Sequence, residues 1–171
     1  KVLCYVNTTA DVKAECDLCC TSANAVRMAG EIIKDEKEII FIPDQNLAAF
    51  VEKQTGRQFI KWKGFCPIHA TILPEHIEEQ RRLHPAADVI VHPECLPAVI
   101  AAADRALSTE GMARYVKQSA KEEFIIGTET GIIPRLQREN PGKRFYAASD
   151  RAECPNMKLT TLEKVLWALE E

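Results

Sequence analysis

The chain has 171 residues, of which 46% are hydrophobic, and its formal net charge at pH 7 is −3. This length allows one ordinary domain or two small ones with a packed core. The slight acidity argues against nucleic acid or an anionic membrane as a partner, because both favour basic patches, which the sequence lacks. Without a membrane-length apolar run or a signal-peptide pattern, the expected location is the cytoplasm.

The first half of the chain alternates short apolar runs with segments of helical periodicity. The apolar runs predict strands over residues 2–6, 18–20, 39–42 and 58–62. Helices are predicted after Thr8-Thr9, after Thr21-Ser22, from Asp44 to Gly56, and from Pro74 to about Pro85. The second of these helices should bury a single stripe, formed by Ala25, Met28, Ala29, Ile32 and Ile33.

The second half repeats the same order of elements. Its strands are predicted over residues 88–92, 105–108, 124–127 and 144–147, and its helices over 96–103, 110–118 and 131–139. A last helix, opened by a capping box of Thr160 and Glu163, should bury Leu162, Val165, Leu166 and Leu169. The regular alternation of strand and helix predicts parallel sheets with helices on both faces.

An internal repeat organises these elements. Two Cys-Pro pairs, Cys66-Pro67 and Cys154-Pro155, lie 88 residues apart, and each follows a glycine, a basic residue and a phenylalanine. Asp17 has a counterpart in Asp104. We therefore predict an α/β fold of two pseudo-repeated αβα three-layer units, each with a four-stranded parallel sheet. The first unit would span residues 1–86 and carry Cys66, and the second would span 87–171 and carry Cys154.

Ligands of parallel α/β sheets bind outside the carboxyl ends of the strands, so the residues that follow each strand are the site candidates. They are Asn7, Ser22, Cys66, His92, Glu94, Thr109 and Cys154. Ser22 and Thr109 would put hydroxyls at helix N-termini that favour an anion, although a plain helix cap is the commoner role of such residues. His92 and Glu94 flank a rigid proline and could serve acid–base chemistry, but a His-x-Glu pattern alone is weak support.

The seven cysteines fall into two groups. Cys16-x-x-Cys19 has no second pair to complete a zinc ribbon, and Cys4, Cys19, Cys20 and Cys95 are expected to be core thiols. Cys66 and Cys154 instead lie in loops at matching positions of the repeat. Two alternatives stay open for them: a zinc hydrolase that recruits His69 as third ligand, or an iron–sulfur cluster whose third thiolate comes from a further unit.

Seven motifs spread over the whole chain resemble those of the quinolinate synthase family. They are Tyr5-Val6-Asn7, Thr21-Ser22-Ala23-Asn24-Ala25, Pro43-Asp44-x-Asn46-Leu47, Gly64-x-Cys66-Pro67-x-His69, His92-Pro93-Glu94-Cys95, Ile126-Gly127-Thr128-Glu129 and Cys154-x-Asn156-Met157-Lys158. The resemblance implies three pseudosymmetric αβα domains around a [4Fe-4S] cluster with one cysteine ligand per domain. This chain would be the second and third domains, with Cys66 and Cys154 as ligands, and the third ligand would belong to a missing N-terminal domain.

The resemblance also implies an activity. The family condenses iminoaspartate with dihydroxyacetone phosphate to quinolinate, in NAD biosynthesis, with the open iron acting as a Lewis acid. A possible partner is the enzyme that supplies iminoaspartate. The chain alone is expected to be inactive, and the remaining alternatives are a metal-free α/β binding module and an incomplete inactive fragment.

Site roles carried over from the resemblance fall on strand-end residues and add Tyr5 and Ser108. Tyr5 and Asn7 would contact substrate, with Tyr5 also moving protons. Ser22 and the pair Ser108-Thr109 would bind a carboxylate or phosphate. His92 and Glu94 would orient substrate and transfer protons. The segment Leu107-Ser108-Thr109-Glu110 departs from the family's more usual Gly-Ser-Thr-Ser.

Overall fold

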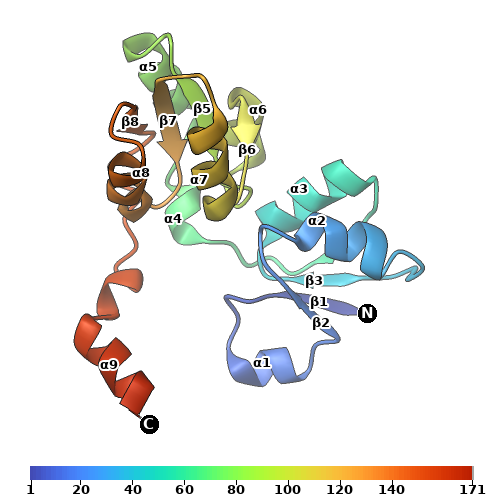
Figure 1. Cartoon of the computed structure of the whole chain (residues 1–171). Helices are drawn as coiled ribbons and strands as arrows, with labels where there is room; N and C mark the ends of the chain where they lie inside the picture. The colour runs from blue at the N-terminus through green and yellow to red at the C-terminus, as the bar shows by residue number, and fades with distance from the viewer. Residues whose placement is uncertain (171) are drawn as a thin grey trace.

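The computed structural model describes residues 1–170 and contains two four-stranded sheets (Figure 1). The strand order is β2-β1-β3-β4 in the first sheet and β6-β5-β7-β8 in the second, and every strand pairing is parallel. Both units thus share one topology, in which the strand that comes first in the sequence occupies the second place in the sheet. The predicted α/β fold with two four-stranded parallel sheets is confirmed.

The first sheet packs its described core on one face. Its strands are β1 (Val2–Tyr5), β2 (Leu18–Cys20), β3 (Ile40–Ile42) and β4 (Ile60–Lys61). Leu3 and Phe41 face a core completed by α2 (Ala25–Arg27), the π-turn η1 (Met28–Ile32) and α3 (Gln45–Thr55). The short helix α1 (Ala10–Ala14) follows β1 without a side-chain cap from Thr9. Part of this sheet remains open to solvent, since the side chain of Trp62, next to β4, is 67% exposed.

Two expectations for this unit are wrong. The predicted stripe assumed an unbroken α-helix, but the backbone N–H of Ile33 donates to the carbonyl of Met28 (3.1 Å), a π-type bond. The wider turn rotates the later residues, so Ile33 is buried and Ile32 is 55% exposed. Cys19 is exposed rather than buried because β2 is an edge strand in which Leu18 and Cys20 turn toward the core and Cys19 turns away from it.

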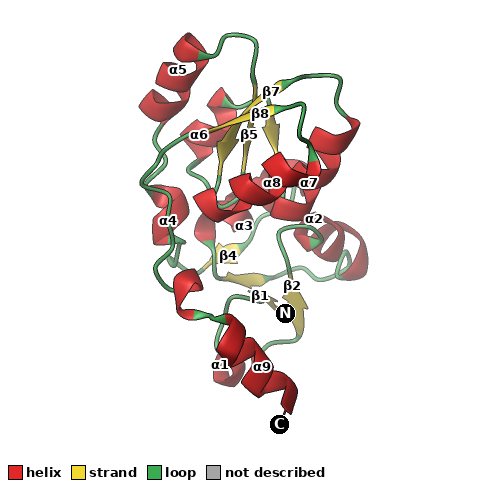
Figure 2. Ribbon diagram, turned by 60° about the vertical axis from the view of Figure 1, so that its left-hand side comes forward, coloured by secondary structure: helices red, strands yellow, loops and turns green. Residues whose placement is uncertain are grey.

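The second sheet is covered on both faces. Its strands are β5 (Asp88–Val91), β6 (Arg105–Ala106), β7 (Glu123–Gly127) and β8 (Arg144–Ala147). Figure 2 shows helices on either side of the sheet; they are α5 (Pro74–Leu83), α6 (Pro97–Ala102), α7 (Thr109–Gln118) and α8 (Ile133–Glu139). Successive residues of β7 enter opposite cores, Ile125 one and Phe124 with Ile126 the other. This burial on both faces explains the continuous apolar run of β7.

The repeat is visible in individual hydrogen bonds. Asp17 accepts a hydrogen bond from the backbone N–H of Val2 (2.7 Å), and Asp104 accepts one from Val89 (2.8 Å). In each unit, the aspartate therefore connects the loop before one strand (β2 or β6) to the neighbouring strand (β1 or β5). The predicted pairing of Asp17 with Asp104 is confirmed.

The segment between the two sheets packs on the second one. After the short helix α4 (Pro67–Ala70), Ile72 and Ile77 join the core that contains Val89 and Ile125. The chain thus contributes to the second unit's core before residue 87. The boundary between residues 86 and 87 stays a prediction.

The last helix, α9 (Leu162–Glu170), does not bury its apolar face as predicted. It extends away from both sheets (Figure 1), and within the described residues Leu162 is 90% exposed and Leu169 79% exposed. The hydroxyl of Thr161, rather than Thr160, accepts the capping bond, from the N–H of Lys164 (3.3 Å). Across residues 1–170, no helix combines the length and the apolarity needed to cross a membrane.

Candidate functional site

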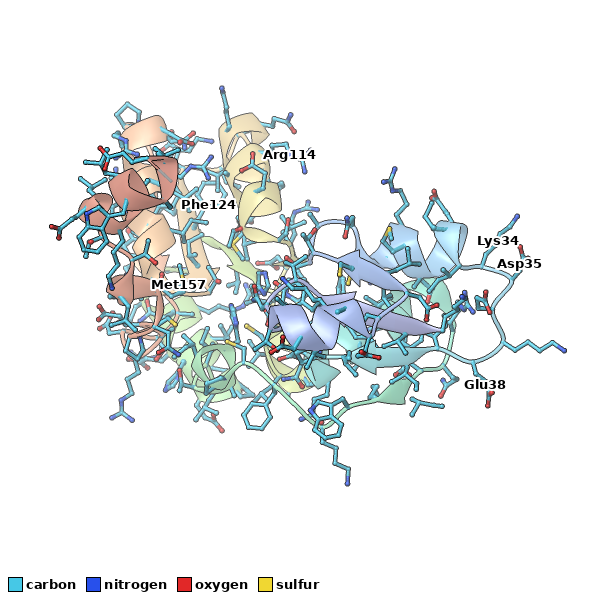
Figure 3. All side chains as sticks on the ribbon, turned by 90° about the horizontal axis from the view of Figure 1, so that it is seen from below. Lys34, Asp35, Glu38, Arg114, Phe124 and Met157 are labelled. Atoms are coloured by element: carbon cyan, nitrogen blue, oxygen red, sulfur yellow. The ribbon has the colours of Figure 1, made fainter. Side chains whose placement is uncertain are left out.

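The strand-end residues gather around two cavities that share Tyr5, Asn7 and Glu94 in their walls. The first cavity, of about 470 Å³, also has Cys66 and Cys154 in its wall. The second, of about 440 Å³, is lined by other polar residues, among them Ser22, His69, His92, Thr109, Thr128, Arg135 and Lys158. Figure 3 shows Met157, which also lines this second cavity, far from the loop of Lys34, Asp35 and Glu38 at the opposite end of the molecule.

Equivalent carboxylates hold the two cysteine loops. Asp44, after β3, caps α3 by accepting from the N–H groups of Asn46 (2.6 Å) and Leu47 (3.0 Å), and its second oxygen accepts from the N–H of Cys66 (2.5 Å). The predicted N-cap is confirmed, and the same side chain fixes the start of the cysteine loop. Burial raises the pKa of the Asp44 carboxyl, an effect its three N–H donors partly offset.

Glu129, after β7, does the same in the second unit. Its carboxylate accepts from the N–H of Gly131 (2.8 Å) and from the N–H of Cys154 (3.3 Å). Burial raises its pKa, but the ion pair with Lys158 (3.0 Å) and the two N–H donors outweigh burial and leave the pKa below its ordinary value. Each sulfur-bearing loop therefore starts from a backbone N–H anchored on a carboxylate.

Glu94 is buried where the two units meet. Its Oε2 accepts from the hydroxyl of Tyr5 (3.3 Å) and lies 3.2 Å from Nδ1 of His92. The side-chain amide of Asn46 donates to the backbone carbonyl of Glu94 (3.3 Å). Burial raises the pKa of Glu94, but the hydrogen bond and charge of His92, with smaller contributions from His69 and Tyr5, lower it below the ordinary value. The site thus holds a buried carboxylate that is ionised at neutral pH.

Two histidines stack beside this carboxylate. The rings of His69 and His92 are 4.5 Å apart between centroids. His92 contacts the hydroxyl of Ser22 through Nε2 (3.1 Å), and His69 contacts that of Thr128 (2.9 Å). Burial, followed by the neighbouring His92, lowers the pKa of His69 to about 4, so its ring is neutral at pH 7. Its Nδ1 is buried and has no hydrogen-bond partner among the described residues.

All site residues predicted from the sequence line at least one of the two cavities, except Ser108. Ser22 contacts His92 and does not cap a helix, whereas Ser108 caps α7 by accepting from the N–H of Gly111 (3.1 Å) and lines neither cavity. Thr109, next to it, lines the second cavity. Sequence reasoning gave no site role to Thr128, Arg135 or Lys158, although the first and last lie in motifs that it quoted. Substrate binding by Ser108 stays a prediction.

Two sheets of identical strand order, with matched cysteine loops opening on one cavity, define an α/β protein built from a duplicated unit. Comparison with known proteins identifies the family of this chain. A profile of the family described as quinolinate synthetase A protein (NadA) matches residues 1–171, and the chain belongs to this family. The resemblance seen in the motifs is thereby confirmed.

Several curated relatives match nearly the whole chain. Proteins named quinolinate synthase are 54% identical over 169 residues in Desulforudis audaxviator, 52% over 169 residues in Dehalococcoides mccartyi, and 50% over 168 residues in Methanoregula boonei. These alignments cover at least 98% of this chain but 55% of each relative. The chain therefore spans about half the length of the curated relatives it matches.

Proposed function

We propose that this chain is part of a quinolinate synthase, which condenses iminoaspartate with dihydroxyacetone phosphate to quinolinate in NAD biosynthesis. The observation that carries the proposal is that Cys66 and Cys154, at matching positions of the repeat, line one cavity together with Tyr5, Asn7 and Glu94. Family membership supports the same assignment. The reaction would take place in the cytoplasm on small-molecule substrates, without nucleic acid or membrane, and the enzyme that supplies iminoaspartate is a candidate partner.

The two thiols fit the [4Fe-4S] cluster that the family implies. Cysteine thiolates are the ligands of such clusters, and neither thiol is fully buried. Anchoring of the Cys66 and Cys154 N–H groups on Asp44 and Glu129 fixes the direction in which each loop leaves its sheet. When bound, the cluster supplies a Lewis-acidic iron that polarises a substrate oxygen. The third cysteine would come from outside these 171 residues, so we expect the chain alone to lack turnover.

The second cavity suits the anionic end of a substrate. Arg135 and Lys158 bring positive charge to its wall, and the hydroxyls of Ser22 and Thr109 can donate hydrogen bonds to a carboxylate or phosphate. We assign substrate positioning to these hydroxyls and to Asn7, which lines both cavities. A substrate bound there would extend past Glu94 toward the cysteine loops.

Glu94 is the proposed general base, with Tyr5 and His92 beside it. An ionised carboxylate at the boundary of both cavities can take a proton from a substrate carbon. Burial, followed by the charge of Glu94, raises the pKa of Tyr5, so its hydroxyl stays protonated and can donate. His92, held by Ser22, is placed to stabilise the charge on Glu94 and on the substrate.

The proposal is tested in a chimera of the Desulforudis audaxviator relative, with these 171 residues in place of the aligned segment. After anaerobic reconstitution with iron and sulfide, we expect a brown protein that forms quinolinate. Cys66→Ser and Cys154→Ser should each lose the cluster, because each removes one thiolate ligand. Cys95→Ser is the control, since Cys95 is fully buried.

The alternatives make different predictions for the same experiment. A colourless chimera without bound iron would favour a metal-free α/β binding module, which the family membership does not favour. Retention of the full cluster in Cys66→Ser, together with its loss in Cys95→Ser, would show that the ligand assignment is wrong.

A further inference from the structure

A second set of metal-ligand types meets around Glu94. A sulfur of Cys66, a ring nitrogen of His69 and a carboxylate oxygen of Glu94 all lie within 4.8 Å of one another. Thiolate, imidazole and carboxylate together form a donor set that suits zinc and related divalent transition metals. Cys154 does not belong to this group, so the group differs from the pair of matched cysteines.

The orientation of His69 provides an independent observation. Its Nε2 is engaged with the hydroxyl of Thr128 (2.9 Å), while Nδ1 is buried without a hydrogen-bond partner among the described residues. A buried polar atom without a partner costs free energy, and a metal-bound imidazole has one nitrogen on the metal and the other on an oxygen. The arrangement therefore leaves Nδ1 available to a ligand, and Nδ1 lies 3.7 Å from Oε2 of Glu94.

The distances are close to those of a bound ion. With metal–ligand bonds of about 2.0–2.3 Å, a sulfur, a nitrogen and an oxygen ligand in tetrahedral positions are separated by roughly 3.3–3.6 Å. The His69–Glu94 separation of 3.7 Å is already near this range. The sulfur of Cys66 lies within 4.8 Å of both atoms, so a shift of at most about 1.3 Å closes the remaining gap. Cys66 is only partly buried and lies in a loop, so the shift does not disturb a core.

We propose that Cys66, His69 and Glu94 form a mononuclear site for a divalent cation of the zinc class. Cys66 lines the first cavity, His69 the second and Glu94 both, so the ion would lie where the cavities meet, with its fourth position open to solvent or to the carboxylate of a small anion. The proposal does not depend on the cluster. Because Cys66 would serve both metals, the divalent cation and the cluster would exclude each other.

The site can be tested with Co²⁺ as a spectroscopic probe in the 171-residue chain. The background should carry Cys16→Ser and Cys19→Ser, which removes the only C-x-x-C pair of the sequence. Anaerobic titration should give one equivalent of bound Co²⁺, with a thiolate-to-cobalt charge-transfer band and the intense visible bands of four-coordinate cobalt. Added Zn²⁺ should abolish these bands, because zinc binds such sites more tightly than cobalt.

Matched variants separate this site from the paired cysteines. Cys66→Ser, His69→Gln and Glu94→Gln each remove a ligand and should weaken Co²⁺ binding by more than about a hundredfold, beyond the usual cost of losing an outer contact. Thr128→Val, which removes the partner of His69 Nε2, should weaken it by about 10–100-fold. Cys154→Ser changes the equivalent loop and should leave both the affinity and the spectrum unchanged.

Two results would overturn the proposal. One is loss of the charge-transfer band in Cys154→Ser to the same extent as in Cys66→Ser, which would place the ion between the two cysteine loops. The other is unchanged Co²⁺ affinity in His69→Gln. Far-UV circular dichroism identifies any variant that fails to fold. If a ligand variant fails, the Co²⁺ affinity of Thr128→Val, which leaves all three ligands in place, decides whether the site exists.

Discussion

At the scale of single residues, Glu94 joins the two units of the site. Tyr5 and Asn46 reach it from the first unit, one through the carboxylate and the other through the backbone carbonyl. His92 adds a contact from the second unit and keeps the pKa of Glu94 low despite burial. A carboxylate held from both sides in this way is fixed in position and ionised at neutral pH.

Replacement of Glu94 by glutamine tests its proposed role as a base. The amide keeps the size of the side chain and its contact to Tyr5 but cannot accept a proton. In the chimera described above, Glu94→Gln should lower turnover by about a hundredfold or more, the usual size of a general-base effect. Steady-state kinetics on reconstituted protein measures this loss. Near-normal turnover with a raised KM would instead assign Glu94 to substrate positioning.

Sequence reasoning found the residues at the ends of strands but not their contacts. Parallel strands end at one edge of a sheet, so the strand assignment predicted Asn7, His92 and Glu94 as site residues, whereas Tyr5 followed from the resemblance. The contact between His69 and Thr128 joins residues 59 positions apart, and no spacing rule indicates it. Ser22 and Thr109 were the candidate helix caps, yet Ser22 contacts His92 and the cap of α7 is Ser108.

At the scale of elements, the carboxylate after the third strand of each unit links a helix start to a cysteine loop. In the first unit, Asp44 serves both, one oxygen for α3 and the other for Cys66. In the second unit, Glu129 contacts Gly131 and Cys154. A change at either residue should therefore affect helix stability and loop position together.

Two substitutions of Asp44 separate these effects. Asp44→Ala removes the cap and should lower the free energy of unfolding by about 1–2 kcal/mol. Asp44→Asn should cost less, because an asparagine oxygen still caps a helix while its NH₂ group cannot accept from Cys66. Urea unfolding measures both, with Asp35→Ala, on an exposed loop, as an acid-to-alanine control. Equal costs for Asp44→Ala and Asp44→Asn would contradict the capping role.

The limits of prediction for the elements have a physical origin. Asp44 and Gly56 carry local signals, a capping side chain and a glycine with φ of 71°, and both ends of α3 were predicted. The wide turn at Met28–Ile32 carries no such signal, because it has neither a capping side chain nor a glycine at positive φ. The apolar periodicity of α9 predicts a core face, but it does not indicate whether a partner surface is present to cover that face.

At the scale of the whole molecule, the two sheets share a topology but not an environment. The second sheet has cores on both faces, whereas the first packs its described core on one face and leaves Ile40 and Ile60 exposed. The repeat in the sequence predicted the common strand order, because matched motifs at matched spacing require matched folds. The repeat did not predict that Ile72 and Ile77 pack on the second sheet, because apolar residues in this connecting segment could pack on either sheet.

The outward position of α9 affects how unfolding can be observed. The sequence contains two tryptophans, Trp62 and Trp167 on α9, whose side chains are 67% and 52% exposed. The fluorescence of the folded chain should therefore already have its maximum at the long wavelength of hydrated indole. Urea should shift this maximum little, while far-UV circular dichroism shows the loss of structure. A short-wavelength maximum that moves strongly to the red on unfolding would mean that these indoles are covered in solution.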